Sequence, residues 1–256
     1  MLKGLLLCCV LVSLVLVPVL CTAQPAGAAD VQSLLSAFMY YTDLRVRSVQ
    51  QSLEILASTA EAQSANWDNM KGLLTGYQKS DSGFVVWFVL PDGSYYTVDK
   101  GLMDVKLNDR EYFPHLVAGH EVTGSLVVSK STGQRSAVIA VPVKKGDKVV
   151  GAVGASLFLD ALSDQVDAIL APPADETFFA LAPNGLTTIH RKTDRNFLDP
   201  RTLGSETLAA AVNEMLSKPS GEVTYVFDQV TKKAVYRTSS LTGWKFAIAF
   251  NEAGAK

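Results

Sequence analysis

The chain has 256 residues, of which 48% are hydrophobic, and a formal net charge of −2 at pH 7. A charge this close to neutral, without a basic run, argues against a partner bound through nucleic-acid phosphates. All three cysteines, Cys8, Cys9 and Cys21, lie near the N-terminus. If that segment is removed, the remainder has no disulfide, thiolate metal site or cysteine nucleophile.

Residues 1–23 are expected to be a signal peptide or an N-terminal membrane anchor. Lys3 precedes an apolar run from Leu5 to Cys21, and Ala23 offers a small-residue cleavage point. The run is close to the ~20 residues that span a bilayer, so cleavage and anchoring both remain open. Either way, we expect the rest of the chain to be periplasmic or extracellular.

Residues 30–78 are expected to form a long helix and a shorter one. Residues 30–62 contain no Gly or Pro, and their apolar side chains recur at helical spacing. A shorter amphipathic helix around Trp67 is expected to end near Gly76. The long helix has two interpretations: it packs along a sheet domain, or it is a dimerisation stalk leading away from the membrane.

Residues 79–170 alternate between strand-forming runs and turns. Pro91-Asp92-Gly93 and Lys145-Gly146-Asp147 have the composition of tight turns between antiparallel strands. Short helices are expected within 109–119 and 160–170. The expected strands are residues 84–90, 94–99, 124–129, 136–143 and 148–159.

Residues 171–250 repeat this order after the Ala-Pro-Pro-Ala linker at 171–174. Ser205 is expected to cap a helix that runs to about 217, and residues 251–256 form a tail. The expected strands are residues 177–182, 186–190, 222–227, 234–239 and 245–250. Two similar units of antiparallel strands with interposed helices predict an α+β protein with two lobes.

Several motifs resemble the double Cache family, the extracytoplasmic sensor modules of bacterial and archaeal chemoreceptors and histidine kinases. They are Leu-Asn-Asp-Arg-Glu-Tyr-Phe at 107–113, Ser-Thr-Gly at 131–133, the strand at 137–143, Val-Val-Gly-Ala-Val-Gly-Ala-Ser-Leu-Phe-Leu-Asp at 149–160, Ala-Pro-Asn-Gly at 182–185 and Leu-Thr-Gly-Trp-Lys-Phe at 241–246. The resemblance implies a long N-terminal helix followed by two PAS-like lobes. Residues 79–170 would be the membrane-distal, ligand-binding lobe, and residues 171–250 the membrane-proximal lobe.

Arg110, close to Tyr112 and Phe113, is the first candidate ligand-binding residue. A guanidinium can hold a carboxylate through two hydrogen bonds, while aromatic rings bury the carbon skeleton. The alternative is an exposed Arg110 paired with Asp109 or Asp104, with both rings in the core. The resemblance implies the pocket. Further candidates to line it are Trp87, Tyr95, Tyr96, His115 and Ser156, with Trp87 either a wall of the pocket or plain core.

Ser156 bears on the identity of the ligand. The resemblance implies that amino-acid-binding members have an Asp at the position of Ser156, where it pairs with the ligand's amino group. An ammonium without an anionic partner keeps its desolvation cost. We therefore expect a short organic acid without an amine, such as a mono- or dicarboxylate with two to four carbon atoms.

The sequence contains no motif that indicates an enzyme. Gly154-Ala155-Ser156-Leu157-Phe158 lacks the second glycine of a nucleophile elbow. His115 and His120 are five residues apart, which does not fit one helical face, and His190 belongs to the other lobe. We expect no catalytic activity, no cofactor and no metal.

The expected function is that of an extracytoplasmic ligand-binding sensor module in signal transduction or chemotaxis. The last strand is followed by only a short tail, from which we expect no cytoplasmic output domain in this chain. The alternatives are a structural or assembly protein of the cell envelope with a vestigial pocket, or a fragment of a chemoreceptor or histidine kinase. Expected partners are a small carboxylate, a membrane receptor or kinase, and a second copy through the long helix.

Overall fold

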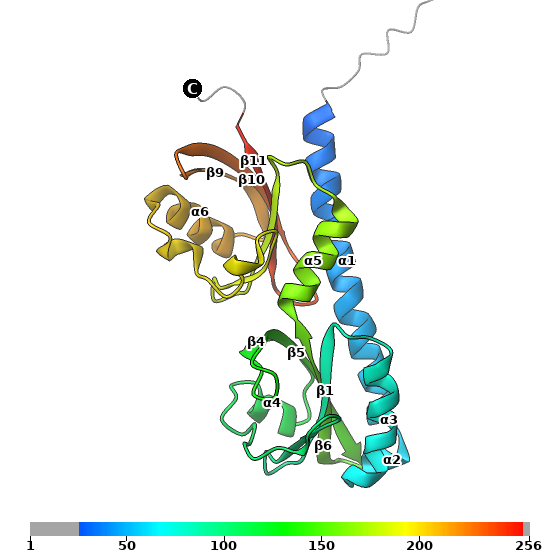
Figure 1. Ribbon diagram of the computed structural model, residues 1–256. Helices are drawn as coiled ribbons and strands as arrows, with labels where there is room; N and C mark the ends of the chain where they lie inside the picture. Colours follow the sequence, from blue (N-terminus) through cyan, green and yellow to red (C-terminus); the bar gives the residue numbers. More distant parts are fainter. Residues whose placement is uncertain (1–25, 253–256) are drawn as a thin grey trace, which may run out of the picture.

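The computed structural model describes residues 26–252, and their side chains from residue 31 onward. The predicted signal or anchor, residues 1–23, lies outside the described residues. The described chain is a long helix beside two stacked lobes (Figure 1). None of the helices within residues 26–252 combines the length and the apolar character needed to cross a membrane.

The expected helix over residues 30–62 is interrupted. The first helix, α1, spans Ala26–Ala57, and α2 spans Ala60–Gln63. Between them Thr59 adopts an extended conformation, and its hydroxyl accepts a hydrogen bond from the Ala62 amide at 3.2 Å. Threonine is a better N-cap than interior helical residue, so the chain stops and restarts here. The next helix, α3, spans Trp67–Lys79 and so continues past Gly76.

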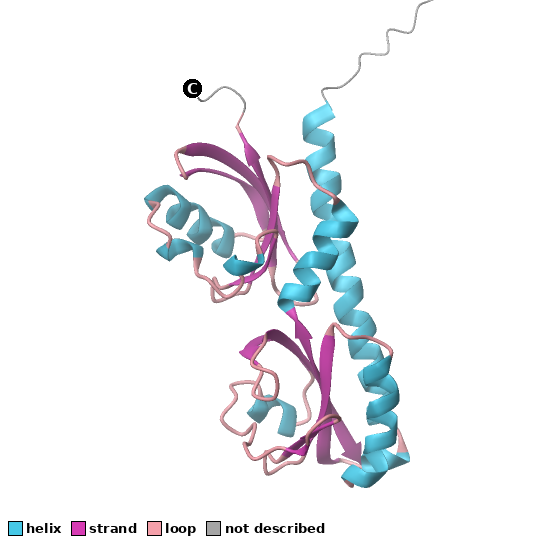
Figure 2. Cartoon of the chain, viewed as in Figure 1, coloured by secondary structure: helices cyan, strands magenta, loops and turns pink. Residues whose placement is uncertain are grey.

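The first lobe contains a six-stranded antiparallel sheet in the order β3-β2-β1-β6-β5-β4. Helices α1 and α3 cover one face, and α4 lies on the other (Figure 2). The elements are β1 Phe84–Val89, β2 Tyr95–Thr97, β3 Gly101–Leu102, α4 Phe113–Val117, β4 Val122–Val128, β5 Arg135–Lys145 and β6 Lys148–Phe158. The helix expected within 109–119 is thus a single short turn.

The second lobe contains a five-stranded antiparallel sheet in the order β8-β7-β11-β10-β9. Helix α5 leads into it from β6 beside α1, and α6 covers its outer face (Figure 1). The elements are α5 Leu159–Leu170, β7 Thr177–Leu181, β8 Thr187–His190, the 3₁₀ turns η1 Thr193–Arg195 and η2 Pro200–Thr202, α6 Glu206–Ser217, β9 Ser220–Phe227, β10 Val230–Thr238 and β11 Lys245–Asn251.

Helix α1 packs against both sheets through one buried stripe. The ring centroid of Phe38, which has no exposed surface, lies 5.2 Å from that of Phe178 and 4.8 Å from that of Phe246, both in the second sheet. Further along α1, the guanidinium of Arg45 lies 5.5 Å from the ring of Phe84 in the first sheet and pairs with Asp81. One helix therefore contributes side chains to the hydrophobic core of both lobes.

A polar network also joins the lobes. Arg135, the first residue of β5, donates hydrogen bonds to the Asp160 carboxylate at 2.7 Å and to the Asn196 carbonyl at 2.8 Å. The Asn196 side chain donates in turn to Asp160 at 2.8 Å and to Ser163 at 3.1 Å. Asn196 follows η1 and is almost fully buried. The loop after β8 is thereby attached to α5 and to the first lobe.

Replacing Phe38 with Ala should lower the free energy of unfolding by about 3–5 kcal/mol, because the change leaves a cavity where α1 meets the second sheet. Urea denaturation of the purified protein measures the loss. Tyr40→Ala provides the matched control on the same helix, since 69% of Tyr40 is exposed, and a change within about 0.5 kcal/mol is expected there. Equal losses in the two variants would contradict this assignment of the core.

Candidate functional site

The first-lobe cavity lies on the side of the first sheet opposite α1. Its lining residues come from β1, β2, β4, β6, the loop after β4 and the segment before α4. They are Trp87, Tyr95, Leu107, Arg110, Tyr112, Val127, Ser129, Lys130, Ser131 and Ser156. The free volume is about 10 Å³, which is the room of one water molecule at most. At the place where the pocket is predicted, the side chains themselves therefore fill the space.

Trp87 lines this cavity and packs closely against β6. Its indole lies flat on β6 at Gly154: a Cβ placed there would come within 2.1 Å of the indole. The indole N–H donates a hydrogen bond to the Ser156 hydroxyl at 3.1 Å, and the ring stacks with Tyr112 at 6.5 Å. Trp87 is thus a buried core residue and also lines the first-lobe cavity.

Tyr95 and Arg110 give the cavity its polar character. The Tyr95 hydroxyl is buried and has no hydrogen-bond partner among the described residues. Burial raises the pKa of Tyr95, and the positive charge of Arg110 partly opposes that shift. Arg110 donates to the Val128 carbonyl at 2.7 Å. The alternative pairing with Asp109 does not occur, because Lys130 holds that carboxylate at 2.6 Å.

Three of the predicted site residues do not reach this cavity. Tyr96 points to the opposite face of the sheet, since alternate residues of a strand face opposite sides, and it stacks on Trp67 of α3 at 5.0 Å. Phe113 is buried in the core beneath α4. His115 is exposed on α4 and lines only a shallow hollow beside Glu121. The structure brings together Trp87, Tyr95, Arg110, Tyr112 and Ser156.

An inter-lobe cleft of about 650 Å³ adjoins the first-lobe cavity. Residues 109–112 and 123–127 line one side of it, and residues 182–184 with Trp244 line the other. Gly124 has φ = 83°, and a Cβ there would lie 3.2 Å from the Trp244 indole nitrogen, so glycine permits this close approach between the lobes. Arg110 and Tyr112 line both spaces and therefore separate the small cavity from the open cleft.

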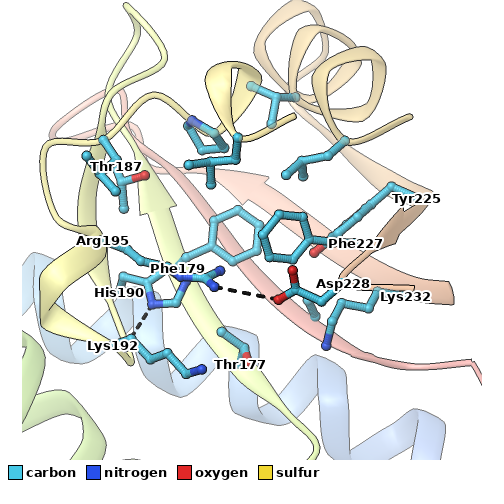
Figure 3. A pocket seen from close by; sticks show the side chains of 16 residues that line it. Thr177, Phe179, Thr187, His190, Lys192, Arg195, Tyr225, Phe227, Asp228 and Lys232 are labelled. Atoms are coloured by element: carbon cyan, nitrogen blue, oxygen red, sulfur yellow. Dashed lines mark hydrogen bonds and ion pairs between the residues drawn. The ribbon is translucent and has the colours of Figure 1, made fainter. Parts of the chain in front are cut away.

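The second-lobe cavity was not found from the sequence. It has a volume of about 120 Å³ and lies between the second sheet, α6 and the loop after β8 (Figure 3). Its residues come from eight separate elements and the loops between them, so no contiguous motif marks them. The only local sign is the basic stretch His190-Arg191-Lys192 with Arg195, directly after a strand.

His190 forms part of the wall of the second-lobe cavity. Its Nδ1 accepts a hydrogen bond from the Lys192 amide at 2.8 Å, which leaves Nε2 to carry the proton of the neutral ring. Burial of the ring, together with the positive charges of Arg195 and Lys192, lowers the pKa of His190 to about 3. The imidazole stacks on Phe179 with 6.3 Å between ring centroids. It is therefore an uncharged wall at neutral pH.

Gly154→Ala should displace the Trp87 indole, because the added methyl group would overlap it. We expect a loss of about 1–3 kcal/mol of unfolding free energy from overpacking, measured by urea denaturation, together with altered indole fluorescence. The control is Gly76→Ala in α3, where nothing lies within 4 Å of the new Cβ; that change should stabilise the protein slightly. Equal stability of both variants and an unchanged emission spectrum would contradict the packing described.

The low pKa of His190 predicts a stability that depends on pH. Between pH 6.5 and about 3, the unfolded chain binds a proton that the folded chain does not. The free energy of unfolding should therefore be complete above pH 6.5 and fall as the pH drops, by up to about 1.4 kcal/mol per unit from this residue. Urea denaturation at pH 7.5 and pH 5 should show a smaller fall for His190→Gln than for the wild type. An equal fall would contradict the burial of a neutral ring.

A family model described as Cache domain matches residues 23–255. Methyl-accepting chemotaxis protein McpB of Bacillus subtilis (strain 168) is 24% identical over 208 residues. The match covers 79% of this chain and 30% of McpB, so the chain spans less than a third of that relative.

Two solved structures share the fold. The extracellular ligand binding receptor from Desulfohalobium retbaense DSM5692 has a TM-score of 0.69 at 14% identity, over 86% of this chain and 40% of that one. The sensory domain of the Campylobacter jejuni chemoreceptor Tlp3, with isoleucine bound, has a TM-score of 0.64 at 12% identity, over 88% of this chain and 92% of that one. The predicted resemblance and α+β architecture are confirmed, and the chain belongs to the Cache domain family of extracytoplasmic sensor domains.

Proposed function

We propose that this chain senses a short organic acid outside the cytoplasm and binds it in the first-lobe cavity. The observation that carries the proposal is the buried hydroxyl of Tyr95, which has no partner among the described residues and lies in a cavity also lined by Arg110. A buried polar group without a partner is costly. An oxygen of a ligand carboxylate would satisfy both the phenol and the guanidinium.

The charges around the cavity favour an anion without an amine. Arg110 and Lys130 are its ionic lining residues, and hydroxyls are supplied by Ser129, Ser131 and Ser156. No carboxylate is present among the described residues that line it. Lys130 is already paired with Asp109, so the amino group of an α-amino acid would be desolvated beside the Arg110 cation and would find no anionic partner among the described lining residues. This supports the absence of the amine, although Tlp3 was solved with isoleucine.

Binding requires the cavity to expand, which is how it would produce a signal. A free volume of about 10 Å³ is too small for a carboxylate of two to four carbons. Tyr112 and Arg110 border the inter-lobe cleft, so their movement toward the cleft opens the cavity and alters the surface that faces the second lobe. A ligand that binds only the opened form shifts the population toward it.

The proposal also covers export, signal output and association with a second copy. Residues 1–23 direct export or anchor the chain, and the output passes to a membrane receptor or kinase of a chemotaxis or related signalling pathway. Tyr40, Leu44 and Ile55 on α1 are exposed and form a surface that a second copy can cover. We assign no catalytic role. A structural protein of the envelope would show no ligand response, so ligand screening decides between these functions.

Thermal and urea denaturation with acetate, propionate, succinate and related acids tests the proposal. Ligand at 100 times Kd should add about 2.7 kcal/mol to the free energy of unfolding. Arg110→Ala should abolish that gain. Tyr95→Phe should leave the unliganded protein at least as stable, because it removes an unsatisfied hydroxyl, yet reduce the gain from ligand.

The control is Lys106→Ala, which removes an exposed cation paired with Asp92 outside the cavity and should preserve the ligand response. Absence of stabilisation by every acid, or full retention in Arg110→Ala, would refute the site. Stabilisation by amino acids alone would refute the proposed ligand class.

A further inference from the structure

We propose that the second-lobe cavity is an independent ligand site for a monocarboxylate with a compact apolar body of about six carbon atoms. Nothing in this proposal depends on ligand binding by the first lobe. The cavity has an apolar interior and a cationic mouth, and the closest carboxylate pairs with those cations only at long distance.

The interior is suited to a compact hydrocarbon group. Phe179 and Ala249 of the sheet and Leu208 and Val212 of α6 supply apolar walls, and Figure 3 shows the rings of Phe179 and Phe227 side by side at its centre. The volume of about 120 Å³ is comparable to the roughly 150 Å³ of a dry apolar cavity that accommodates benzene. A single ring or a branched aliphatic chain fits, whereas a drug-sized molecule does not.

The mouth is suited to one negative charge. Lys192 and Arg195 come from the loop after β8 and Lys232 from β10, and the only carboxylate among the described lining residues is Asp228. Arg195 approaches Asp228 only to 3.9 Å, and the Asp228 side chain is 73% exposed. A pair this long and this exposed contributes little. The three lining cations therefore outnumber the single lining carboxylate by two. Little interaction energy is lost when they turn toward a ligand carboxylate.

Arg195 connects the two parts of the site. Its guanidinium lies 5.0 Å from the ring of Phe227, so it stands over the apolar interior with only a quarter of its side chain exposed. A carboxylate that binds Arg195 thus leaves its apolar body directed inward. Lys232 also lines the cavity and donates a hydrogen bond to the Asn251 side chain at 3.1 Å. His190, uncharged, adds a ring wall without adding charge.

The turn at the mouth adds support. Asp228 and Gln229 both have positive φ, 51° and 62°, as a tight two-residue hairpin turn requires. Gln229 has no glycine-like freedom there, and such strained conformations cluster at binding sites. The turn holds Phe227 and Asp228 at the entrance.

Isothermal titration with benzoate and isovalerate tests the proposal, with benzamide as the uncharged counterpart. The wild type should bind the acids and not the amide. Arg195→Gln should weaken binding by about tenfold to a hundredfold, the range for a lost charge-assisted contact. Lys232→Gln should weaken it less, and Lys233→Gln, the neighbouring lysine paired with Glu222, should not change it.

A second variant, Ala249→Phe, fills the interior and should abolish binding, with circular dichroism to confirm that it folds. Arg110→Ala should retain full affinity, which separates this site from the first-lobe cavity. Absence of binding to the wild type would overturn the proposal. So would equal affinity in Arg195→Gln, or loss of binding in Arg110→Ala with retention in both second-lobe variants.

Discussion

The packing of α1 against both sheets is the constraint on which the rest of the structure depends. Phe38 is enclosed by rings of the second sheet, while Val49 and Leu53 belong to the same continuous core as Phe84 of the first sheet. Neither sheet could bury its inner face without this helix. Movement of one lobe is therefore resisted by the buried side chains of α1, and any change in lobe arrangement must be accommodated along the helix.

Much of the fold follows from local sequence rules. Helical spacing over residues 30–62 predicted the long helix, and the Pro-Asp-Gly and Lys-Gly-Asp turns predicted hairpins that the structure contains. The break at Thr59 was missed because periodicity continues across it, whereas a capping side chain competes locally with the helix. The order of the six strands could not be predicted from the sequence, because β1 pairs with β6, which is distant in sequence.

The candidate site could be predicted only in part from the sequence, for similar reasons. Trp87, Tyr95, Arg110, Tyr112 and Ser156 converge because their strands or loops share one face of the first sheet. Tyr96 was included because a strand's sequence does not show which of two adjacent aromatics faces the pocket, and a register shift by one residue exchanges them. The filling of the cavity by Trp87 depends on Gly154 in another strand. The second-lobe cavity is lined by residues of eight elements and has no contiguous motif.

Arg195 and Asn196 are consecutive in the chain, but their side chains lie in different surroundings. Arg195 lines the second-lobe cavity, and Asn196 is buried in the network with Arg135 and Asp160 that fastens the two lobes. Consecutive Cα atoms are 3.8 Å apart by covalent geometry, so a displacement of one residue is passed to the other without an intervening contact. Arg110 and Tyr112 of the first-lobe cavity line the inter-lobe cleft, which also contains Phe197, the residue after Asn196. Ligands in the two cavities would thus both act on the contact between the lobes. The arrangement of the lobes would then depend on the concentrations of two ligands rather than of one.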